Sequence, residues 1–141
     1  MSLTNYTAAA LLNSMFGKTS NFGALGSAPT IYVGLSSTAP NEDGTNVTEP
    51  SGGSYARVQT AASDWNSATN ADPSVLDNAN AVTFPKATAD WLSGSNLTHF
   101  ILVDAATGGN ILASGSLPTA KPVLTDDTTE FAAGDLDVTM T

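Results

Sequence analysis

The sequence predicts a mainly β fold: a single antiparallel β-sandwich or barrel-like domain with one N-terminal α-helix. Three observations support this prediction: a hairpin pattern in the second half of the chain, short alternating segments between turn clusters, and one amphipathic stretch near the start. The 141 residues match the length of one ordinary domain, and no linker divides them. We therefore expect one domain over residues 1–141, with the helix within 1–17 and a β-rich body over 30–141.

The amphipathic stretch covers residues 4–16 and predicts a helix with one apolar face. Thr4 is placed to cap its start, and Gly17 is placed to end it. Two interpretations stay open: the helix packs on its own domain, or it is an anchor that docks on a neighbouring subunit. In the second case the candidate partner-docking residues are Leu11, Leu12, Met15 and Phe16.

The clearest β signal is a hairpin over residues 97–117. A continuous apolar run over residues 99–103 suits a strand that is covered on both faces. Turn chemistry follows at once, because Gly108 and Gly109 reach positive φ freely and the flanking Asp and Asn side chains can bond nearby backbone. An alternating run over residues 111–117 then predicts the return strand.

Shorter strands are expected at residues 30–36, 55–60, 81–85, 128–131 and 136–140. In the first of them, Gly34 stands where another group approaches the strand closely. Residues 37–54 show no periodicity and contain two prolines, so we expect a long loop that projects from the body. Its candidate exposed residues are Asn41, Glu42, Asp43 and Thr45.

The charge balance excludes two classes of partner. Four basic residues face thirteen acidic ones, for a net charge of −9. Binding to nucleic acid or to an anionic membrane surface requires clustered Lys and Arg, which this chain does not have. No apolar run approaches the length of about 20 residues that spans a membrane. The chain also has no cysteine, which removes disulfides and thiolate metal sites.

No residue pattern points to catalysis, a cofactor or a metal. His99 is the only histidine, and its place in an apolar strand indicates a packed side chain rather than a base or a ligand. The run over residues 41–46 resembles the start of a calcium loop, but Asn46 and Gly52 stand at its sixth and twelfth positions, where Gly and Glu are needed. A solvated acidic turn is the simpler interpretation. Four aromatic residues form either core or a sugar-stacking platform: Tyr32, Tyr55, Trp65 and Trp91.

Several segments resemble a family of small structural proteins of tailed bacteriophages. They are the stretches IYVGLSSTAPNEDG, TEPSGGSYARV, VTFPKATADW, LTHFILVDAATGGNILASGSL and FAAGDLDVT. The resemblance spans most of residues 1–140 and implies a virion component without enzymatic activity. It also implies an exterior position on the particle, assembly in the host cytoplasm, and partners that are the major capsid protein or tail proteins. We expect a homo-oligomer, with a trimer as its particular form.

Our leading hypothesis from the sequence is a capsid decoration or cement protein, because a compact chain without shaft repeats suits that role. A tail-fibre or tail-tip component is the alternative within the same class. A different class is a carbohydrate-binding module that would use Trp65, Trp91 and the 37–54 loop to contact host glycans. A hydrolase ranks last, since nothing in the spacing of the thirteen acidic residues favours a catalytic pair.

Overall fold

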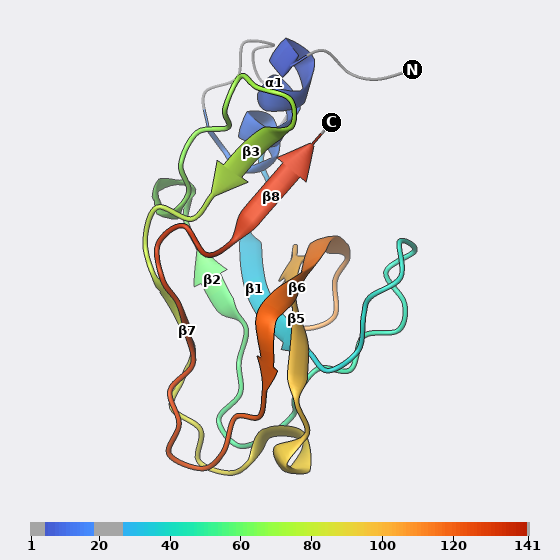
Figure 1. The fold of residues 1–141 in the computed structure, drawn as a ribbon, viewed down its shortest axis with the longest axis vertical. Coiled ribbons are helices and arrows are strands. Elements are labelled where there is room, and N and C mark those ends of the chain that lie inside the picture. The colour runs from blue at the N-terminus through green and yellow to red at the C-terminus, as the bar shows by residue number, and fades with distance from the viewer. Residues whose placement is uncertain (1–4, 19–26, 141) are drawn as a thin grey trace. The chain divides into compact units, whose positions relative to one another are not determined.

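The structure is a computed structural model that describes residues 5–18 and 27–140 (Figure 1). The chain divides into two compact units. The first contains residues 1–30, 61–82 and 131–141, and the second contains residues 31–60 and 83–130. The single domain over residues 1–141 stays a prediction.

The first unit is a helix packed on a strand pair. Its elements are α1 (Asn5–Met15), the 3-10 turn η1 (Ala62–Asp64), β3 (Ser74–Asp77) and β8 (Asp137–Met140). Strands β3 and β8 pair antiparallel, and α1 lies against both. The core between them consists of buried apolar side chains: Leu12, Phe16, Trp65, Leu76, Leu136 and Val138.

Helix α1 ends where the sequence predicts. Gly17 has a φ of +68°, which is the left-handed conformation that glycine adopts at no steric cost. The Lys18 N–H donates to the Asn13 carbonyl at 2.7 Å, and the Gly17 N–H donates to the Ser14 carbonyl at 3.3 Å. These two bonds form a Schellman motif, so the prediction for Gly17 is confirmed. The predicted cap, Thr4, lies outside the described residues.

A buried asparagine fixes the turn before β8. Asn78 is fully buried, and its Nδ2 donates to the carbonyls of Asn80 and Ala132, both at 2.8 Å. Its Oδ1 accepts from the Leu136 N–H at 2.8 Å, and its own carbonyl accepts from the Gly134 N–H at 2.8 Å. Since a buried amide is costly unless it is bonded, this set of contacts holds residues 132–136 in one conformation.

The second unit is built on a four-stranded antiparallel sheet in the order β2-β1-β5-β6. The strands are β1 (Ile31–Ser36), β2 (Val58–Thr60), β5 (Leu97–Val103) and β6 (Ile111–Lys121). The two central strands, β1 and β5, are almost entirely buried, whereas β6 forms one edge and has no buried residue. A 3-10 turn, η2 (Trp91–Gly94), also belongs to this unit. Two short strands, β4 (Val82–Thr83) and β7 (Glu130–Phe131), pair as a separate two-stranded sheet.

The predicted fold class is confirmed: the chain is mainly β, its sheets are antiparallel, and it has one helix near the N-terminus. The central hairpin is also confirmed, with β5 and β6 joined through residues 104–110.

Strand β2 begins at Val58 rather than at residue 55, because the Tyr55 N–H closes a turn onto the Gly52 carbonyl at 2.9 Å. Strand β3 was not predicted, since it is a four-residue segment inside a polar stretch. Within the described residues, no helix is long and apolar enough to cross a membrane.

Candidate functional site

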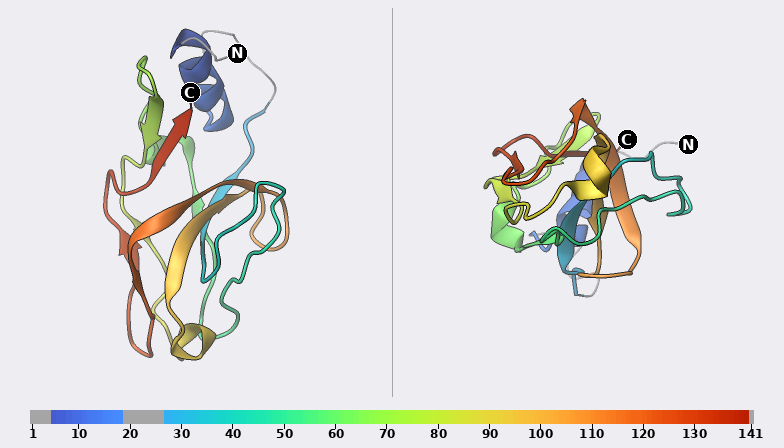
Figure 2. Two further views of the ribbon diagram at one scale, coloured as in Figure 1. Left: turned by 45° about the vertical axis from the view of Figure 1, so that its right-hand side comes forward. Right: turned by 90° about the horizontal axis from the view of Figure 1, so that it is seen from below.

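The 37–54 loop stands out to one side of the sheet of its own unit (Figures 1 and 2), and its tip lies across a groove from the first residues of β6. Its two arms are held together near the sheet by a buried serine at the end of β1. The Ser36 Oγ accepts from the Thr38 N–H at 3.2 Å and from the Thr48 N–H at 3.1 Å, and the Ser37 N–H donates to the Thr48 carbonyl at 2.9 Å. The loop is therefore fixed where it leaves the sheet.

The tip of this loop consists of residues 41–45, and its bonds close mostly on itself. The Asn41 N–H donates to the Thr45 carbonyl at 2.9 Å. The Asp43 Oδ1 accepts from the Thr45 hydroxyl at 2.6 Å and from the Thr45 N–H at 3.0 Å. These two bonds, with the hydroxyl contact first, lower the pKa of Asp43. Glu42 makes no hydrogen bond or ion pair with the described residues.

The four candidate loop residues, Asn41, Glu42, Asp43 and Thr45, are all exposed. They stand at one place on the surface, so they can meet a partner together.

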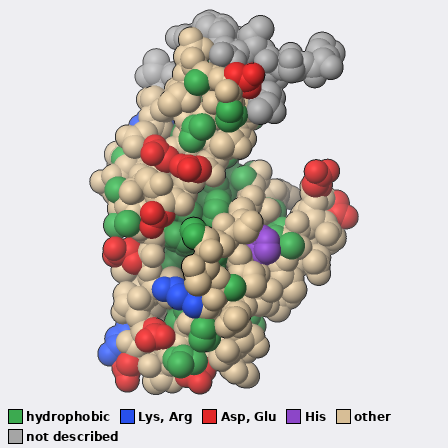
Figure 3. Space-filling model, viewed as in Figure 1, with side chains coloured by type: hydrophobic (Ala, Val, Ile, Leu, Met, Phe, Trp, Pro, Cys, Tyr) green, Lys and Arg blue, Asp and Glu red, His purple; other side chains and the backbone are tan. Residues whose placement is uncertain are grey.

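Over residues 5–18 and 27–140, no group of three or more His, Cys, Asp or Glu side chains is placed to hold a metal ion. Acidic side chains outnumber basic ones on the face drawn in Figure 3.

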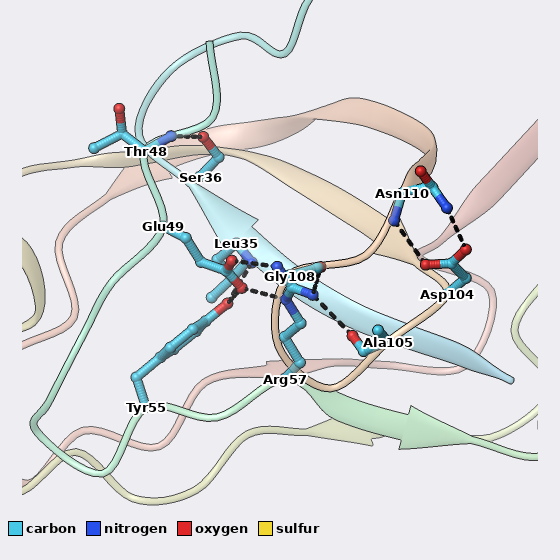
Figure 4. A network of polar contacts seen from close by, with 10 residues as sticks. All are labelled: Leu35, Ser36, Thr48, Glu49, Tyr55, Arg57, Asp104, Ala105, Gly108 and Asn110. Carbon is cyan, nitrogen blue, oxygen red and sulfur yellow. Dashed lines mark hydrogen bonds and ion pairs between the residues drawn. The ribbon is translucent and has the colours of Figure 1, made fainter. Parts of the chain in front are cut away.

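A bidentate ion pair fixes the base of the loop (Figure 4). The Arg57 Nε donates to Glu49 Oε1 at 2.8 Å, and Nη2 donates to Oε2 at 2.7 Å. The Arg57 Nη1 also donates to the carbonyls of Ala105 and Gly108, at 2.8 and 2.7 Å. One guanidinium thus joins the base of the loop, the approach to β2 and the β5–β6 turn. We call this arrangement of Glu49, Tyr55 and Arg57 the loop anchor.

Tyr55 completes the loop anchor. Its hydroxyl donates to Glu49 Oε1 at 2.5 Å and accepts from the Leu35 N–H at 3.0 Å. Burial raises the pKa of the Tyr55 hydroxyl, and its hydrogen bond to Glu49 raises it further. The same carboxylate, through its hydrogen bonds, raises the pKa of Arg57. Tyr55 is therefore a neutral donor and Arg57 a fixed cation.

The close approach predicted at Gly34 is found in the loop anchor. A Cβ added at Gly34 would lie 2.8 Å from Glu49 Oε1 and 3.0 Å from the Tyr55 hydroxyl oxygen. A side chain at this position would therefore displace the carboxylate that Arg57 binds. Glycine is therefore required at residue 34 by Glu49, which lies 15 residues further along the chain.

A cavity of about 390 Å³ lies beside the loop anchor, and its lining includes Glu49, Tyr55, Arg57 and Gly108. The polar groups on its wall bond mostly to one another. The wall carries neither a histidine nor a cysteine. Its one carboxylate, Glu49, accepts hydrogen bonds from Arg57 and Tyr55.

The tryptophans proposed for sugar stacking are core residues. Trp65 is 2% exposed and packs edge-on against Phe16, with ring centroids 4.6 Å apart. Trp91 is 1% exposed and packs edge-on against Tyr55 at 5.0 Å, while its Nε1 donates to the Gly53 carbonyl at 2.9 Å. Neither tryptophan ring presents a face to a ligand. Of the four aromatic residues, only Tyr32 has an exposed hydrogen bond.

His99 is half-buried in β5, and its Nδ1 lies 2.8 Å from the Thr98 hydroxyl. No acidic side chain among the described residues bonds to it, so it lacks the orienting partner that a catalytic histidine needs. The placement agrees with a packed, hydrogen-bonded side chain.

The helix residues divide into two pairs. Leu12 and Phe16 are 1% and 2% exposed and belong to the core of their own unit. Leu11 and Met15 are half-buried. The structure therefore leaves Leu11 and Met15 as the residues through which α1 can still meet a partner, and the docking role of this helix stays a prediction.

Sequence reasoning did not single out Glu49, which is the centre of the loop anchor. The available signal was indirect: Tyr55 and Arg57 lie two residues apart, on one side of an expected strand, and a buried Arg requires an acid. Nothing in the sequence indicates which of thirteen acids provides it.

Together, the fold and this site define a small mainly β protein with a projecting loop that an internal ion pair holds in place. The family model of the podophage GP4 fiber I protein gp80 matches residues 2–139, so the chain belongs to this family. It is a structural protein of a bacteriophage virion, of the tail-fibre type, and it associates with other virion proteins. No curated protein matches the chain.

Proposed function

We propose that the chain is a non-enzymatic component of a phage fibre, placed on the exterior of the virion and assembled in the host cytoplasm. The observation that carries the proposal is the loop anchor: an internal Arg57–Glu49 pair presents an exposed loop tip in a fixed position. A protein that works by contact needs such a fixed, exposed group of polar residues. The family description supports the fibre in preference to other parts of the particle.

The site supports binding rather than bond-making. The cavity beside the loop anchor is lined by groups that already bond to one another. The groove beside the tip is lined by Asn41, Glu42, Gly44 and residues 111–114, which include one carboxylate and neither a second acid nor a histidine. Turnover of a surface polysaccharide by the purified chain, abolished by changing a single acidic residue, would contradict this part of the proposal.

A capsid decoration or cement role is the second candidate. It is favoured by one observation: the sequence has no internal repeat, so a long shaft is not built into this chain. In that case the partner is the major capsid protein, and a trimer is the expected form. In the fibre reading the partners are other tail proteins.

The copy number of the chain in purified virions separates the two roles. Quantitative mass spectrometry, referenced to the major capsid protein, should give a few copies per particle for a fibre component. Hundreds of copies per particle would indicate decoration of the shell instead. Gold-labelled antibodies raised against the 37–54 loop should mark the tail in electron micrographs; labels distributed over the head would contradict the fibre role.

A further inference from the structure

The cavity beside the loop anchor lies entirely within the second unit. Residues between Glu49 and Arg57 form one part of its wall, and residues 106–108 of the β5–β6 turn form the rest. Its volume of about 390 Å³ falls within the range of about 300–1,000 Å³ that is usual for small-ligand sites. Ala56, Ala106 and Thr107 are exposed, so the cavity opens to solvent on their side. A small ligand can therefore enter without a rearrangement of the sheet.

The guanidinium on this wall keeps one donor unused. An arginine side chain has five N–H donors. Four of them are bonded in the loop anchor: one from Nε and one from Nη2 to Glu49, and two from Nη1 to backbone carbonyls (Figure 4). The second N–H of Nη2 makes no hydrogen bond with the described residues. Since the Arg57 side chain is only 9% exposed, a ligand that accepts from this N–H would form a charge-assisted hydrogen bond in a largely enclosed place.

An unused acceptor lies directly beside that donor. Glu49 Oε1 accepts from both Tyr55 and Arg57, whereas Oε2 accepts from Arg57 Nη2 alone, at 2.7 Å. Each carboxylate oxygen has about two acceptor sites, so Oε2 can accept a further hydrogen bond. The Thr107 hydroxyl also makes no hydrogen bond with the described residues. The wall therefore offers a ligand one donor, one acceptor and one hydroxyl group.

The other side chains that line the cavity are apolar. Pro50 is buried, and Ala56 and Ala106 contribute methyl groups at the solvent side. The Tyr55 ring also lines the cavity, while its hydroxyl is already bonded to Glu49 and Leu35. Ligand sites commonly combine such an apolar lining with a few polar groups that fix the orientation of the ligand.

The charge on the wall is balanced, and this limits the kind of ligand. An anionic ligand would approach the Glu49 carboxylate, and a cationic ligand would approach the Arg57 guanidinium. Each of these charges already has its partner in the ion pair, so neither attracts an ion strongly. A neutral hydroxyl group, by contrast, can both donate and accept. It can accept from Nη2 and donate to Oε2, since these two atoms lie 2.7 Å apart.

We propose that this cavity binds a neutral sugar ring. A hydroxyl of the sugar would bridge Arg57 Nη2 and Glu49 Oε2, a second would bond the Thr107 hydroxyl, and a C–H face would rest on the apolar lining. This site is separate from the two tryptophans, which are buried in the core. The inference rests on the proposed role of a protein that works by contact. Its test uses the purified full chain, so a failure here leaves the copy-number result unchanged, and the reverse also holds.

The first measurement is a titration followed by nitrogen–proton correlation NMR spectra of the labelled chain. The probes are D-glucose, D-galactose, L-rhamnose and N-acetyl-D-glucosamine. At least one should cause saturable shifts of the amide signals of Ala56, Ala106, Thr107 and Gly108, with a Kd of about 1–10 mM, as befits a single small ring in an open site. If none of the four neutral sugars shifts these signals, the proposal is wrong.

Anionic probes test the balance of charge. D-glucuronate and inorganic phosphate should bind at this cavity at least about tenfold more weakly than the best neutral sugar, because the Glu49 carboxylate lies on the wall. Tighter binding of either anion, with shifts of the same amide signals, would overturn the assignment of a neutral ligand.

A change that fills the cavity tests the location without disturbing the loop anchor. Ala106→Phe places a ring at an exposed lining position and should weaken binding of the best sugar by more than about tenfold. Ala132→Phe is the matched control, since Ala132 is an exposed alanine of the first unit, outside the cavity lining. It should leave the Kd unaltered. Equal weakening by both variants, or full binding by Ala106→Phe, would contradict the proposal.

Thr107→Val tests one hydrogen bond, because it removes the hydroxyl and keeps the shape of the side chain. It should weaken binding by about three- to tenfold. Circular dichroism spectra matching those of the native chain would show that each variant is folded. An unchanged Kd for Thr107→Val would remove Thr107 from the site and contradict the arrangement proposed for the sugar hydroxyls.

A disaccharide of the best sugar identifies the source of the ring. Binding at least as tight as that of the single sugar would indicate a unit of a glycan chain, which continues out of the open side of the cavity. Exclusion of the disaccharide, with the single sugar still bound, would indicate a free sugar as the ligand.

Discussion

The Arg57 guanidinium binds the Glu49 carboxylate through two parallel hydrogen bonds, of 2.8 Å from Nε and 2.7 Å from Nη2. The two side chains are 9% and 20% exposed. A pair with this geometry is fixed more strongly than a surface ion pair, because both partners are largely removed from water and all four atoms align. Together with the Ser36 contacts, it links the base of the 37–54 loop to the sheet.

Removing one partner of this pair should lower the free energy of unfolding substantially. Arg57→Ala leaves the Glu49 carboxylate enclosed with only the Tyr55 hydroxyl as a donor, and we expect a loss of about 3 kcal/mol in the free energy of unfolding. Urea titration measures this change. Lys86→Ala is the control, since it breaks an exposed pair with Asp126 and should cost less than about 1 kcal/mol. Equal costs for the two variants would show that the loop anchor is no stronger than a surface contact.

Acid should destabilise the chain through its turn carboxylates. Asp104 accepts from the Asn110 Nδ2 at 2.8 Å and from the Asn110 N–H at 2.7 Å, and these bonds lower its pKa. A lowered pKa means that the folded state favours the charged form. The stabilisation is therefore complete above the unfolded value of about 4, and it is lost as the pH falls through the folded value.

The measurement for Asp104 is the midpoint of urea unfolding at a series of pH values from neutral to strongly acidic. The native chain should lose stability below about pH 4. Asp104→Asn should show a shallower fall over the same range, because that carboxylate no longer contributes. Glu42→Gln removes an acid that has no bonded partner and serves as the control. A pH dependence that is identical in the native chain and in Asp104→Asn would contradict this account.

The two pairs of residues on α1 should give opposite results. Leu12→Ala opens space in the core of the first unit and should lower the free energy of unfolding by about 2–4 kcal/mol. Changes of the half-buried Leu11 and Met15 to Gln should cost less than about 1.5 kcal/mol, while incorporation into virions should fall if α1 docks on a partner. Counting the chain in particles grown with each variant measures this. Full incorporation of Leu11→Gln and Met15→Gln would end the docking hypothesis.

The turn at η2 should be open to stabilisation. Leu92, Ser93 and Gly94 have φ values of 50°, 54° and 77°, so two side-chain-bearing residues occupy the left-handed region in succession. Such a conformation costs about 1 kcal/mol for each non-glycine residue. Ser93→Gly should therefore raise the free energy of unfolding by about 0.5–1 kcal/mol, measured by urea titration.

Ser95 provides the matched control for this change. It is exposed and lies two residues further on, with a φ of −68°, which any residue adopts freely. Ser95→Gly gains no relief in the folded state and adds freedom to the unfolded chain, so it should destabilise slightly. If both glycine variants shift stability in the same direction, the left-handed turn does not store the expected strain.

The sequence could predict those parts of the fold in which neighbouring residues determine the outcome. Helix α1 and its end at Gly17 follow from local spacing and from one glycine. The β5–β6 hairpin follows from an apolar run beside a glycine turn. In each case the residues that fix the structure lie close together in the sequence, so a local pattern is sufficient.

The parts that could not be predicted depend on distant partners. Strand β3 exists because Leu76 is covered by the rest of its unit and because the segment pairs with β8 near the other end of the chain. Likewise, Glu49 becomes the centre of the loop anchor only when Arg57 and the β5–β6 turn are brought beside it. Trp65 and Trp91 look like ligand-binding residues by type alone, and only their burial shows that they are core.

The separation of the 37–54 loop into an anchored base and a self-contained tip has a consequence for substitutions and insertions. The residues that hold the base, Ser36, Glu49 and Arg57, lie outside the tip, and the tip bonds mostly to itself. Replacement of residues 41–45 should therefore change the free energy of unfolding only slightly. A segment of different sequence, or an inserted foreign epitope, can therefore be carried at residues 41–45 while the base of the loop keeps its contacts.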